Sequence, residues 1–228
     1  PAAPPWFGLR LRAGNSLIGA RRSVWKKDQL LRGKHYGKYA EIPRQLKPGE
    51  DRQPGEIYHF LVWDEDMAPA ASDKLMKEHW PDECDAINTW RKKQVKTKCS
   101  VEEVVRLERL SERIDELWKD YSISRQRALA DSACTSSVWP KAQNSLEALR
   151  NGPTLRRQEG LKASLEAESG AFQRLKLLMD SWCSFYFWPL DQSDNLPSRA
   201  AWLAAAEVLL GIGTDDLATR AMLDIQLG

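Results

Sequence analysis

A long amphipathic repeat between residues 100 and 130 constrains the fold of this chain more than any other feature. Ser100 and Glu103 have the spacing of a capping box, in which each side chain bonds a backbone N–H at the start of a helix. Apolar side chains then recur at three- and four-residue steps, at Val101, Val104, Val105, Leu107, Leu110, Ile114, Leu117, Trp118 and Tyr121. This spacing predicts a helix that reaches about residue 130 and buries one face.

A second helix of similar length is predicted to begin at Pro153 and Thr154. It runs into the aromatic stretch 185–188 and stops at Pro189, because proline cannot continue the hydrogen-bond ladder. Shorter helices are predicted from a Ser72 cap to Trp80, over 82–98, from a Ser198 cap to Leu210, and after a Thr214 cap. We therefore expect a mainly α fold, in which two helices of about 30 residues form an antiparallel hairpin or part of a bundle.

The first seventy residues differ from this helical remainder, and we predict a domain boundary between residues 70 and 71. Glycine and proline recur there, most densely in the linker-like stretch 46–56. Only the segment IYHFLVW at 57–63 is aromatic and β-branched enough to predict a strand. Residues 1–70 are thus expected to be loop-rich and partly β, and residues 71–228 to form an α-helical domain.

Positive charge is concentrated in residues 10–47. This stretch holds eleven Lys and Arg against two acids, Asp28 and Glu41, which gives it +9 in a chain whose net charge is +2. Such a patch is typical of a protein that contacts a phosphate backbone, although a solvated loop rich in Lys and Arg has the same composition. The residues that we expect to contact DNA are Arg12, Arg21, Arg22, Lys26 and Lys27.

The stretch LRAGNSLIGARR at 11–22 comes close to a phosphate-cradling loop but lacks its essential parts. Ala20 and Arg21 stand where that loop needs a lysine and a hydroxyl, so nothing reaches the terminal phosphates or holds Mg²⁺. We predict a tight turn instead, with backbone freedom from glycine and side-chain hydrogen bonds to the backbone. The turn-forming residues are Gly14, Asn15, Ser16 and Gly19.

Motifs of catalysis and metal binding are missing from the sequence. It contains no H-E-x-x-H, G-x-S-x-G or G-x-G-x-x-G, and its cysteines and histidines are too dispersed for a metal site. The acidic run 64–66 predicts a turn after the strand, and His35 and His59 are expected to be structural.

Most of the ten tryptophans should be core or interface anchors. Four cysteines are expected to be buried, reduced thiols: Cys84, Cys99, Cys134 and Cys183.

The chain has no apolar run of the roughly 18 residues that a membrane helix needs. It starts PAAPPW, without methionine or a charged-then-apolar leader. We therefore expect a cytoplasmic segment of a longer polypeptide that does not enter a membrane.

Five segments, in this order, resemble a known family: 14–22 (GNSLIGARR), 56–67 (EIYHFLVWDEDM), 107–118 (LERLSERIDELW), 182–191 (WCSFYFWPLD) and 196–210 (LPSRAAWLAAAEVLL). They are similar to the middle of large N6-adenine DNA methyltransferases of the restriction-modification type, including the adenine methyltransferase of the DISARM phage-defence system. The resemblance spans nearly the whole chain through short strings. It implies a segment that joins a Rossmann-like core, and an activity that methylates adenine in double-stranded DNA with S-adenosylmethionine.

The same resemblance implies what this segment lacks. The family's cofactor motif lies upstream of GNSLIG and its catalytic N-P-P-[YFW] lies downstream of residues 196–210, and neither is found here. Ala3-Pro4-Pro5-Trp6 is a near match, but alanine replaces asparagine and no apolar strand precedes it. We expect no catalytic, metal-binding or cofactor-binding residue in this chain. The alternative is a non-enzymatic helical scaffold that binds another protein of a defence complex through its tryptophans.

Overall fold

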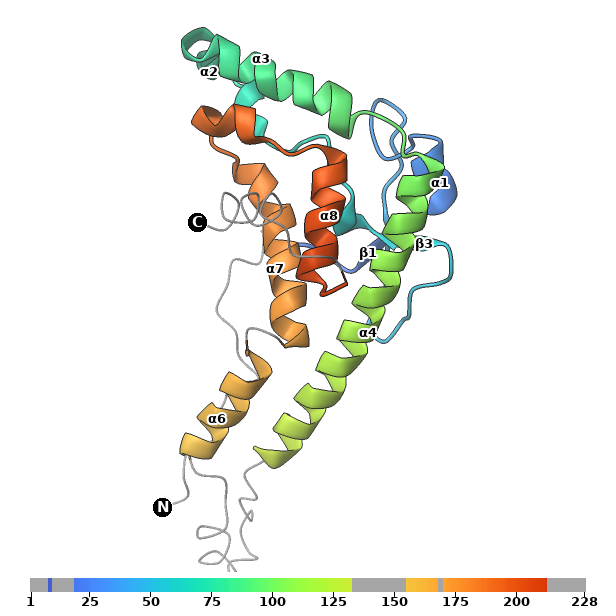
Figure 1. The fold of residues 1–228 in the computed structure, drawn as a ribbon, viewed down its shortest axis with the longest axis vertical. Coiled ribbons are helices and arrows are strands. Elements are labelled where there is room, and N and C mark those ends of the chain that lie inside the picture. The colour runs from blue at the N-terminus through green and yellow to red at the C-terminus, as the bar shows by residue number, and fades with distance from the viewer. Residues whose placement is uncertain (1–7, 10–18, 133–154, 168–169, 213–228) are drawn as a thin grey trace, which may run out of the picture. The chain divides into compact units, whose positions relative to one another are not determined.

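The computed structural model describes residues 8–9, 19–132, 155–167 and 170–212 (Figure 1). The chain forms two compact units, one of residues 1–16 and 116–174 and the other of residues 17–115 and 175–228. We call these the first and the second unit. The predicted boundary between residues 70 and 71 falls inside the second unit, because the segments on either side of it share one core there.

The described residues form helices, a small sheet and several short turns of 3-10 helix. The strands are β1 (Ser23–Lys26), β2 (Arg44–Gln45) and β3 (Glu56–Tyr58). The helices are α1 (Lys27–Leu31), α2 (Lys74–His79), α3 (Pro81–Trp90), α4 (Val101–Asp131), α6 (Leu155–Leu165), α7 (Ala171–Ser184) and α8 (Arg199–Leu209). The 3-10 turns are η1 (His59–Leu61), η2 (Pro69–Ser72), η5 (Phe185–Phe187) and η6 (Leu190–Asn195), and η3 (Arg91–Val95) is π-helical. The predicted fold class, mainly α with a partly β N-terminal segment, is confirmed. Among these helices none has both the length and the apolar composition to cross a bilayer.

A three-stranded antiparallel sheet lies in the second unit, in the order β2-β1-β3. Its central strand places Val24 between Arg44 of β2 and Tyr58 of β3. The sequence analysis predicted neither β1 nor β2, because both are short and lie in the segment that its charge marked as basic. Pairing on both sides allows so short a strand as β1, whose Ser23, Val24 and Trp25 are buried.

The predicted strand 57–63 is too long. β3 ends at Tyr58, and the chain then turns into η1. Two tryptophans of distant helices explain the early end: the Trp202 indole donates to the Leu61 carbonyl and the Trp182 indole to the Val62 carbonyl, both at 2.8 Å. These carbonyls are satisfied without a strand partner, so the segment can leave the sheet.

Aromatic side chains form the core of the second unit. Phe185 is completely buried, and four tryptophan rings lie within 6.1 Å of its ring centroid. Trp63 follows η1, Trp90 ends α3, Trp188 follows η5 and Trp202 lies in α8. Six of the eight described tryptophans are buried, which confirms the core role predicted for most of them. Trp80 and Trp118 are the two that are not.

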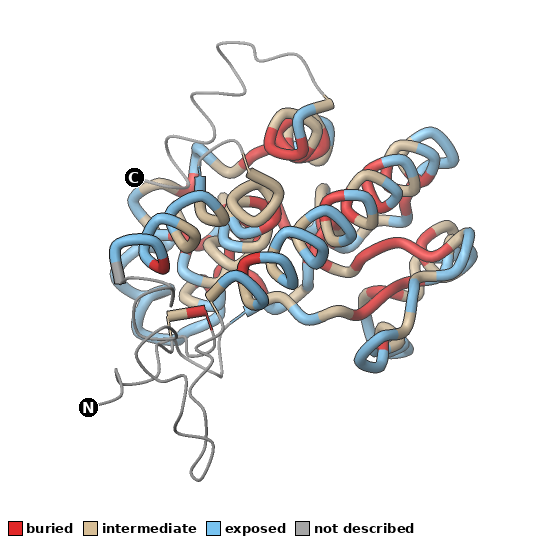
Figure 2. The backbone as a smooth tube through the Cα atoms, turned by 90° about the horizontal axis from the view of Figure 1, so that it is seen from below, coloured by how far each residue is buried: buried red, intermediate tan, exposed pale blue. Residues whose placement is uncertain are grey.

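The helix α4 is confirmed together with its cap. Ser100 Oγ accepts from the Glu103 N–H at 3.1 Å, and the Glu103 carboxylate accepts from the Ser100 N–H at 2.8 Å. In the second unit one face of α4 is buried through Val104, Leu107, Leu110 and Ile114. Val101 and Val105 are exposed, so the buried stripe is narrower than predicted; the tube in Figure 2 shows buried stretches alternating with exposed ones along the helices.

The second long helix is interrupted. It is predicted as one helix from residue 153 to the aromatic run, but α6 ends at Leu165 and α7 begins at Ala171. Gly170 precedes α7, and glycine costs about 1 kcal/mol in a helix interior relative to alanine. Within the first unit the two chain segments run antiparallel. Tyr121 contacts Phe172, and the Ser132 carbonyl, which is later in the sequence than Tyr121, accepts from Gln158, which is earlier than Phe172.

Three smaller helix predictions have different outcomes. Asp73, not Ser72, caps α2, because its carboxylate accepts from the N–H groups of Leu75 and Met76. The helix predicted over 82–98 becomes α3 followed by the π-helical η3. Ser198 caps α8 as predicted, accepting from the Ala201 N–H at 3.2 Å. The predicted cap Thr214 lies outside the described residues.

Candidate functional site: an aromatic cavity beside Arg21

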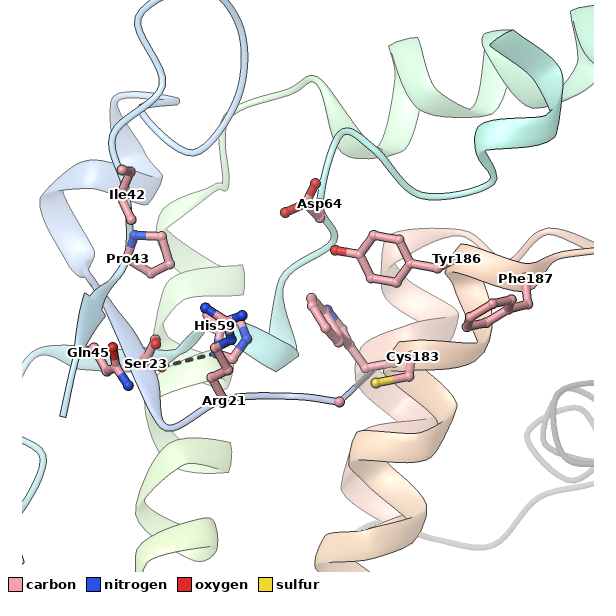
Figure 3. A pocket seen from close by; sticks show the side chains of 12 residues that line it. Arg21, Ser23, Ile42, Pro43, Gln45, His59, Asp64, Cys183, Tyr186 and Phe187 are labelled. Carbon is pink, nitrogen blue, oxygen red and sulfur yellow. Dashed lines mark hydrogen bonds between the residues drawn. The ribbon is translucent and has the colours of Figure 1, made fainter. Parts of the chain in front are cut away.

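The second unit contains a cavity of about 550 Å³, which is within the size range of small-molecule sites (Figure 3). Four segments meet there: the residues that lead into β1, those that lead into β2, the turn after β3, and the end of α7 with η5. The side chains that give the cavity its chemistry are Arg21, Pro43, His59, Asp64, Trp182 and Tyr186. Since these segments are far apart in the sequence, only the packed sheet and helices bring them together.

His59 is held as a neutral hydrogen-bond acceptor. Its Nδ1 lies 3.2 Å from the Ser23 carbonyl, which can only accept, so Nδ1 carries the proton and Nε2 keeps a free lone pair. Burial, with a smaller contribution from the nearby Arg21, lowers the pKa of His59 to about 4 against the opposite effect of the Ser23 hydrogen bond. The sequence analysis predicted a structural histidine; His59 also lines the cavity.

Asp64 and Tyr186 lie next to each other across the cavity from β2 (Figure 3). The Tyr186 hydroxyl donates to the Asp64 carboxylate. Burial raises the pKa of the Asp64 carboxyl, and burial together with the Asp64 charge raises the pKa of Tyr186. Asp64 also accepts from the Asp66 N–H at 2.9 Å, so the acidic run 64–66 forms the predicted turn. This pair presents acceptor atoms to the cavity.

The aromatic wall is rigid inside and exposed at its rim. Trp182 is buried, and its ring lies edge-on to His59 and to Tyr186 at 5.1 and 5.4 Å between centroids. At the rim, in contrast, 64% of Phe187 and 88% of Ile42 are exposed. Large apolar side chains exposed around a cavity are typical of a ligand-binding surface.

Cys183 also lines the cavity, but it has no nucleophilic character. Burial raises the pKa of the Cys183 thiol, and the charge of Asp180 raises it further. A thiol in such surroundings stays protonated and unreactive near neutral pH. The described cysteines are all free, and Cys84 and Cys99 are buried as predicted, whereas Cys183 is half-buried. Cys134 lies outside the described residues.

Arg21 is exposed at the cavity. Its guanidinium lies close enough to His59 to affect the pKa of that ring, and no carboxylate of the described residues pairs with it. Arg21 can therefore offer its donors and its charge to a ligand; the DNA contact predicted for it stays a prediction.

The structure places the other predicted DNA contacts differently. Arg22 donates to the Glu50 carbonyl at 3.0 Å, and Lys27 forms an ion pair with Glu108 of α4. Lys26 is exposed, next to the sheet. Arg12 lies outside the described residues. Of the predicted DNA contacts that the structure describes, Arg21 and Lys26 are the two that are exposed and form no ion pair.

Only one residue of the predicted turn is described. Gly19 has φ +147° and an open space where a Cβ would lie, so it is glycine for its backbone conformation. Gly14, Asn15 and Ser16, as well as Ala3-Pro4-Pro5-Trp6, lie outside the described residues.

The acceptor and aromatic sides of this cavity are not predicted from the sequence. Trp182 is among the tryptophans that are predicted to be core or interface anchors, and Asp64 is predicted only as part of a turn. No strand periodicity in the run 57–63 could have singled out His59, because β3 ends at Tyr58 and His59 begins η1. In the described part of the chain, no group of three or more His, Cys, Asp and Glu is arranged to hold a metal ion.

Comparisons with family models, with curated proteins and with solved structures find no match to this chain.

Proposed function

We propose that this chain is the DNA-contacting segment of an S-adenosylmethionine-dependent N6-adenine DNA methyltransferase of restriction-modification or phage defence. The parent protein acts in the cytoplasm and binds its cofactor through motifs outside this segment. One observation supports the DNA contact above all: Arg21 is exposed, has no carboxylate partner among the described residues, and lies beside an aromatic cavity. The five motif segments support the identity of the parent enzyme.

The ion pairs of the folded chain leave fewer cations free for a phosphate than the basic segment of the sequence suggests. Most cations of residues 10–47 that the structure describes are used inside the second unit: Lys27 pairs with Glu108, and Arg44 with Glu50 and Glu56. An arginine without such a partner is free to form charge-assisted hydrogen bonds with a phosphate. In the described part of this segment Lys26, Lys38 and Lys47 are also exposed without an ion pair, and Arg21 is the cation that lies at the cavity. Arg21 is therefore the first candidate for the phosphate contact.

This contact is tested by the salt dependence of duplex binding to the 228-residue chain. Each lost phosphate contact reduces the slope of log affinity against log salt by about one unit, because fewer counterions are released. We expect Arg21→Gln to reduce that slope by about one unit and to weaken binding equally for all sequences. Fluorescence anisotropy with labelled duplexes at several salt concentrations measures both quantities.

Arg32→Gln is the matched control. Arg32 is an exposed arginine of the same segment, but it pairs with Asp28 at 2.9 Å. Its replacement should leave the slope unchanged. If Arg21→Gln also leaves the slope unchanged, or if the wild-type chain does not bind duplex DNA, the proposal is wrong.

A second candidate function, a helical scaffold for another defence protein, is favoured by the surface of α2. Leu75, Met76 and Trp80 are exposed there by 63%, 39% and 44%. Absence of DNA binding in the experiment above, combined with a protein partner whose binding is lost in Leu75→Ser, would support this scaffold in place of the methyltransferase segment.

A further inference from the structure

We infer that the cavity beside Arg21 is a nucleotide-binding site that takes a base with an exocyclic amino group. The base lies inside, against Trp182 and Tyr186, and the phosphate stays outside, at Arg21. This site is distinct from the methyl-transfer motif, which the resemblance places downstream of residues 196–210. The inference rests on the proposed function only for the source of the nucleotide. If the chain contacts DNA, the nucleotide belongs to a DNA strand; if it does not, the ligand is a free nucleotide.

The aromatic wall supports a flat ligand. Trp182 cannot rotate freely, because its indole N–H donates to the Val62 carbonyl at 2.8 Å and its ring abuts His59 and Tyr186. Pro43 lies on the opposite side of the cavity (Figure 3). Phe187 is an exposed ring at the rim, and its exposed area decreases when a base stacks on it. Stacking on such side chains holds bases that are not paired in a duplex.

The polar groups select an amino-bearing base. His59 offers Nε2 as an acceptor, since Nδ1 donates to Ser23, and Asp64 offers carboxylate oxygens. An exocyclic amine, as in adenine or cytosine, supplies two N–H donors to such acceptors. Thymine presents two carbonyl oxygens and one ring N–H instead, and its carbonyls face the Asp64 carboxylate unfavourably. An acceptor that loses its water to a bound base and gains no donor is costly, so this difference discriminates between bases.

The rim supplies the phosphate contact. Arg21 is exposed there and lies near His59, so a base that reaches Nε2 brings its own phosphate toward the guanidinium. A guanidinium binds a phosphate through two parallel N–H groups. A nucleotide therefore uses both the interior and the rim, whereas a nucleoside uses the interior alone.

Isothermal titration calorimetry of the 228-residue chain tests this site with four probes: dAMP, dCMP, dTMP and deoxyadenosine. We expect dAMP and dCMP to bind, dTMP to bind at least about tenfold more weakly, and deoxyadenosine to bind about tenfold more weakly than dAMP. In Arg21→Gln the difference between dAMP and deoxyadenosine should disappear, because only dAMP loses a contact.

Two further variants separate stacking from folding. Phe187→Ser should weaken dAMP and deoxyadenosine alike by about tenfold, and its control is Leu75→Ser on α2, which removes an exposed apolar side chain of another surface. Tyr186→Phe keeps the ring and removes the hydroxyl that engages Asp64. This variant should retain dAMP binding, since the freed carboxylate accepts from the amine.

The outcomes separate this inference from the proposed function. If no mononucleotide binds but Arg21-dependent duplex binding persists, the nucleotide site is wrong and the DNA proposal stands. If dAMP binds as expected and neither single-stranded nor duplex DNA competes with it, the site is correct with a free nucleotide as its ligand, and the DNA proposal fails. Equal binding of dAMP and dTMP, or an unchanged dAMP affinity in Arg21→Gln, overturns the inference.

Discussion

At the scale of residues, the second unit depends on arginines and tryptophans that bond backbone carbonyls of irregular segments. The Arg91 guanidinium is buried and donates to the carbonyls of Met67 and Ala68, both at 2.6 Å, and to the Ser72 hydroxyl at 3.0 Å. Ala68 has φ +52°, a left-handed conformation that costs energy in a residue with a Cβ. Arg91 therefore stabilises a strained turn that local sequence preferences disfavour.

Arg91→Met should destabilise the second unit by about 2 to 3 kcal/mol, because it leaves buried carbonyls without donors. Arg91→Lys should be only partly better, since an ammonium cannot reproduce the planar guanidinium fork. Urea unfolding followed by tryptophan fluorescence measures this, and Lys92→Met, an exposed neighbour, is the control. A loss no larger than that of the control would show that the turn does not need Arg91.

At the scale of elements, the sequence predicts what is encoded locally. The capping boxes and the apolar period of α4 involve residues three or four apart, so α4 and the α8 cap could be predicted. β1 could not, because its partners Arg44 and Tyr58 are 20 or more residues away. The same holds for the cavity. The charge pattern of the sequence marks Arg21 as a candidate, whereas His59, Asp64 and Trp182 come together only when the chain is packed.

The cap of α4 is also a connection between elements. Glu103, its acidic member, accepts from Arg199 at the start of α8, and Arg199 donates to the Thr97 carbonyl before α4. Ser100→Ala should therefore lower the free energy of unfolding by about 1 kcal/mol. Ser122→Ala makes the same chemical change at an exposed interior position of α4 and should be neutral or slightly stabilising, because alanine has the higher helix propensity. Equal effects of the two changes in urea unfolding would contradict a role for the cap.

At the scale of the whole molecule, the charge of the basic segment is balanced only after folding. Residues 10–47 carry +9 in the sequence, yet Lys27 and Arg44 find their acidic partners in Glu108, Glu50 and Glu56, all outside that segment. A sequence window therefore overstates the charge available to nucleic acid. Of the exposed cations of this segment that have no ion pair among the described residues, Arg21 lies at the cavity, whereas Lys26, Lys38 and Lys47 do not line it.

His35, which is buried, and His59, which is half-buried, make the stability of the second unit depend on pH. Burial, together with the positive charges of Arg199 and Arg21 respectively, lowers the pKa of His35 and of His59 from 6.5 to about 4. The unfolded chain then binds more protons than the folded one between about pH 6.5 and 4, so stability is complete above pH 6.5 and falls as the pH decreases through this window. The loss is on the order of 3 kcal/mol for each histidine.

His59→Asn should remove about half of this pH dependence, because asparagine keeps an N–H donor for the Ser23 carbonyl but does not titrate. Urea unfolding at pH 7, 6 and 5, followed by tryptophan fluorescence, compares the slopes of stability against pH rather than the stabilities themselves. His79→Gln removes a histidine from the exposed surface of α2 and is the control. The free energy of unfolding of His59→Asn could instead depend on pH as steeply as that of the control. His59 would then not have to be neutral for the second unit to fold, and its assignment as a neutral acceptor at the cavity would be wrong as well.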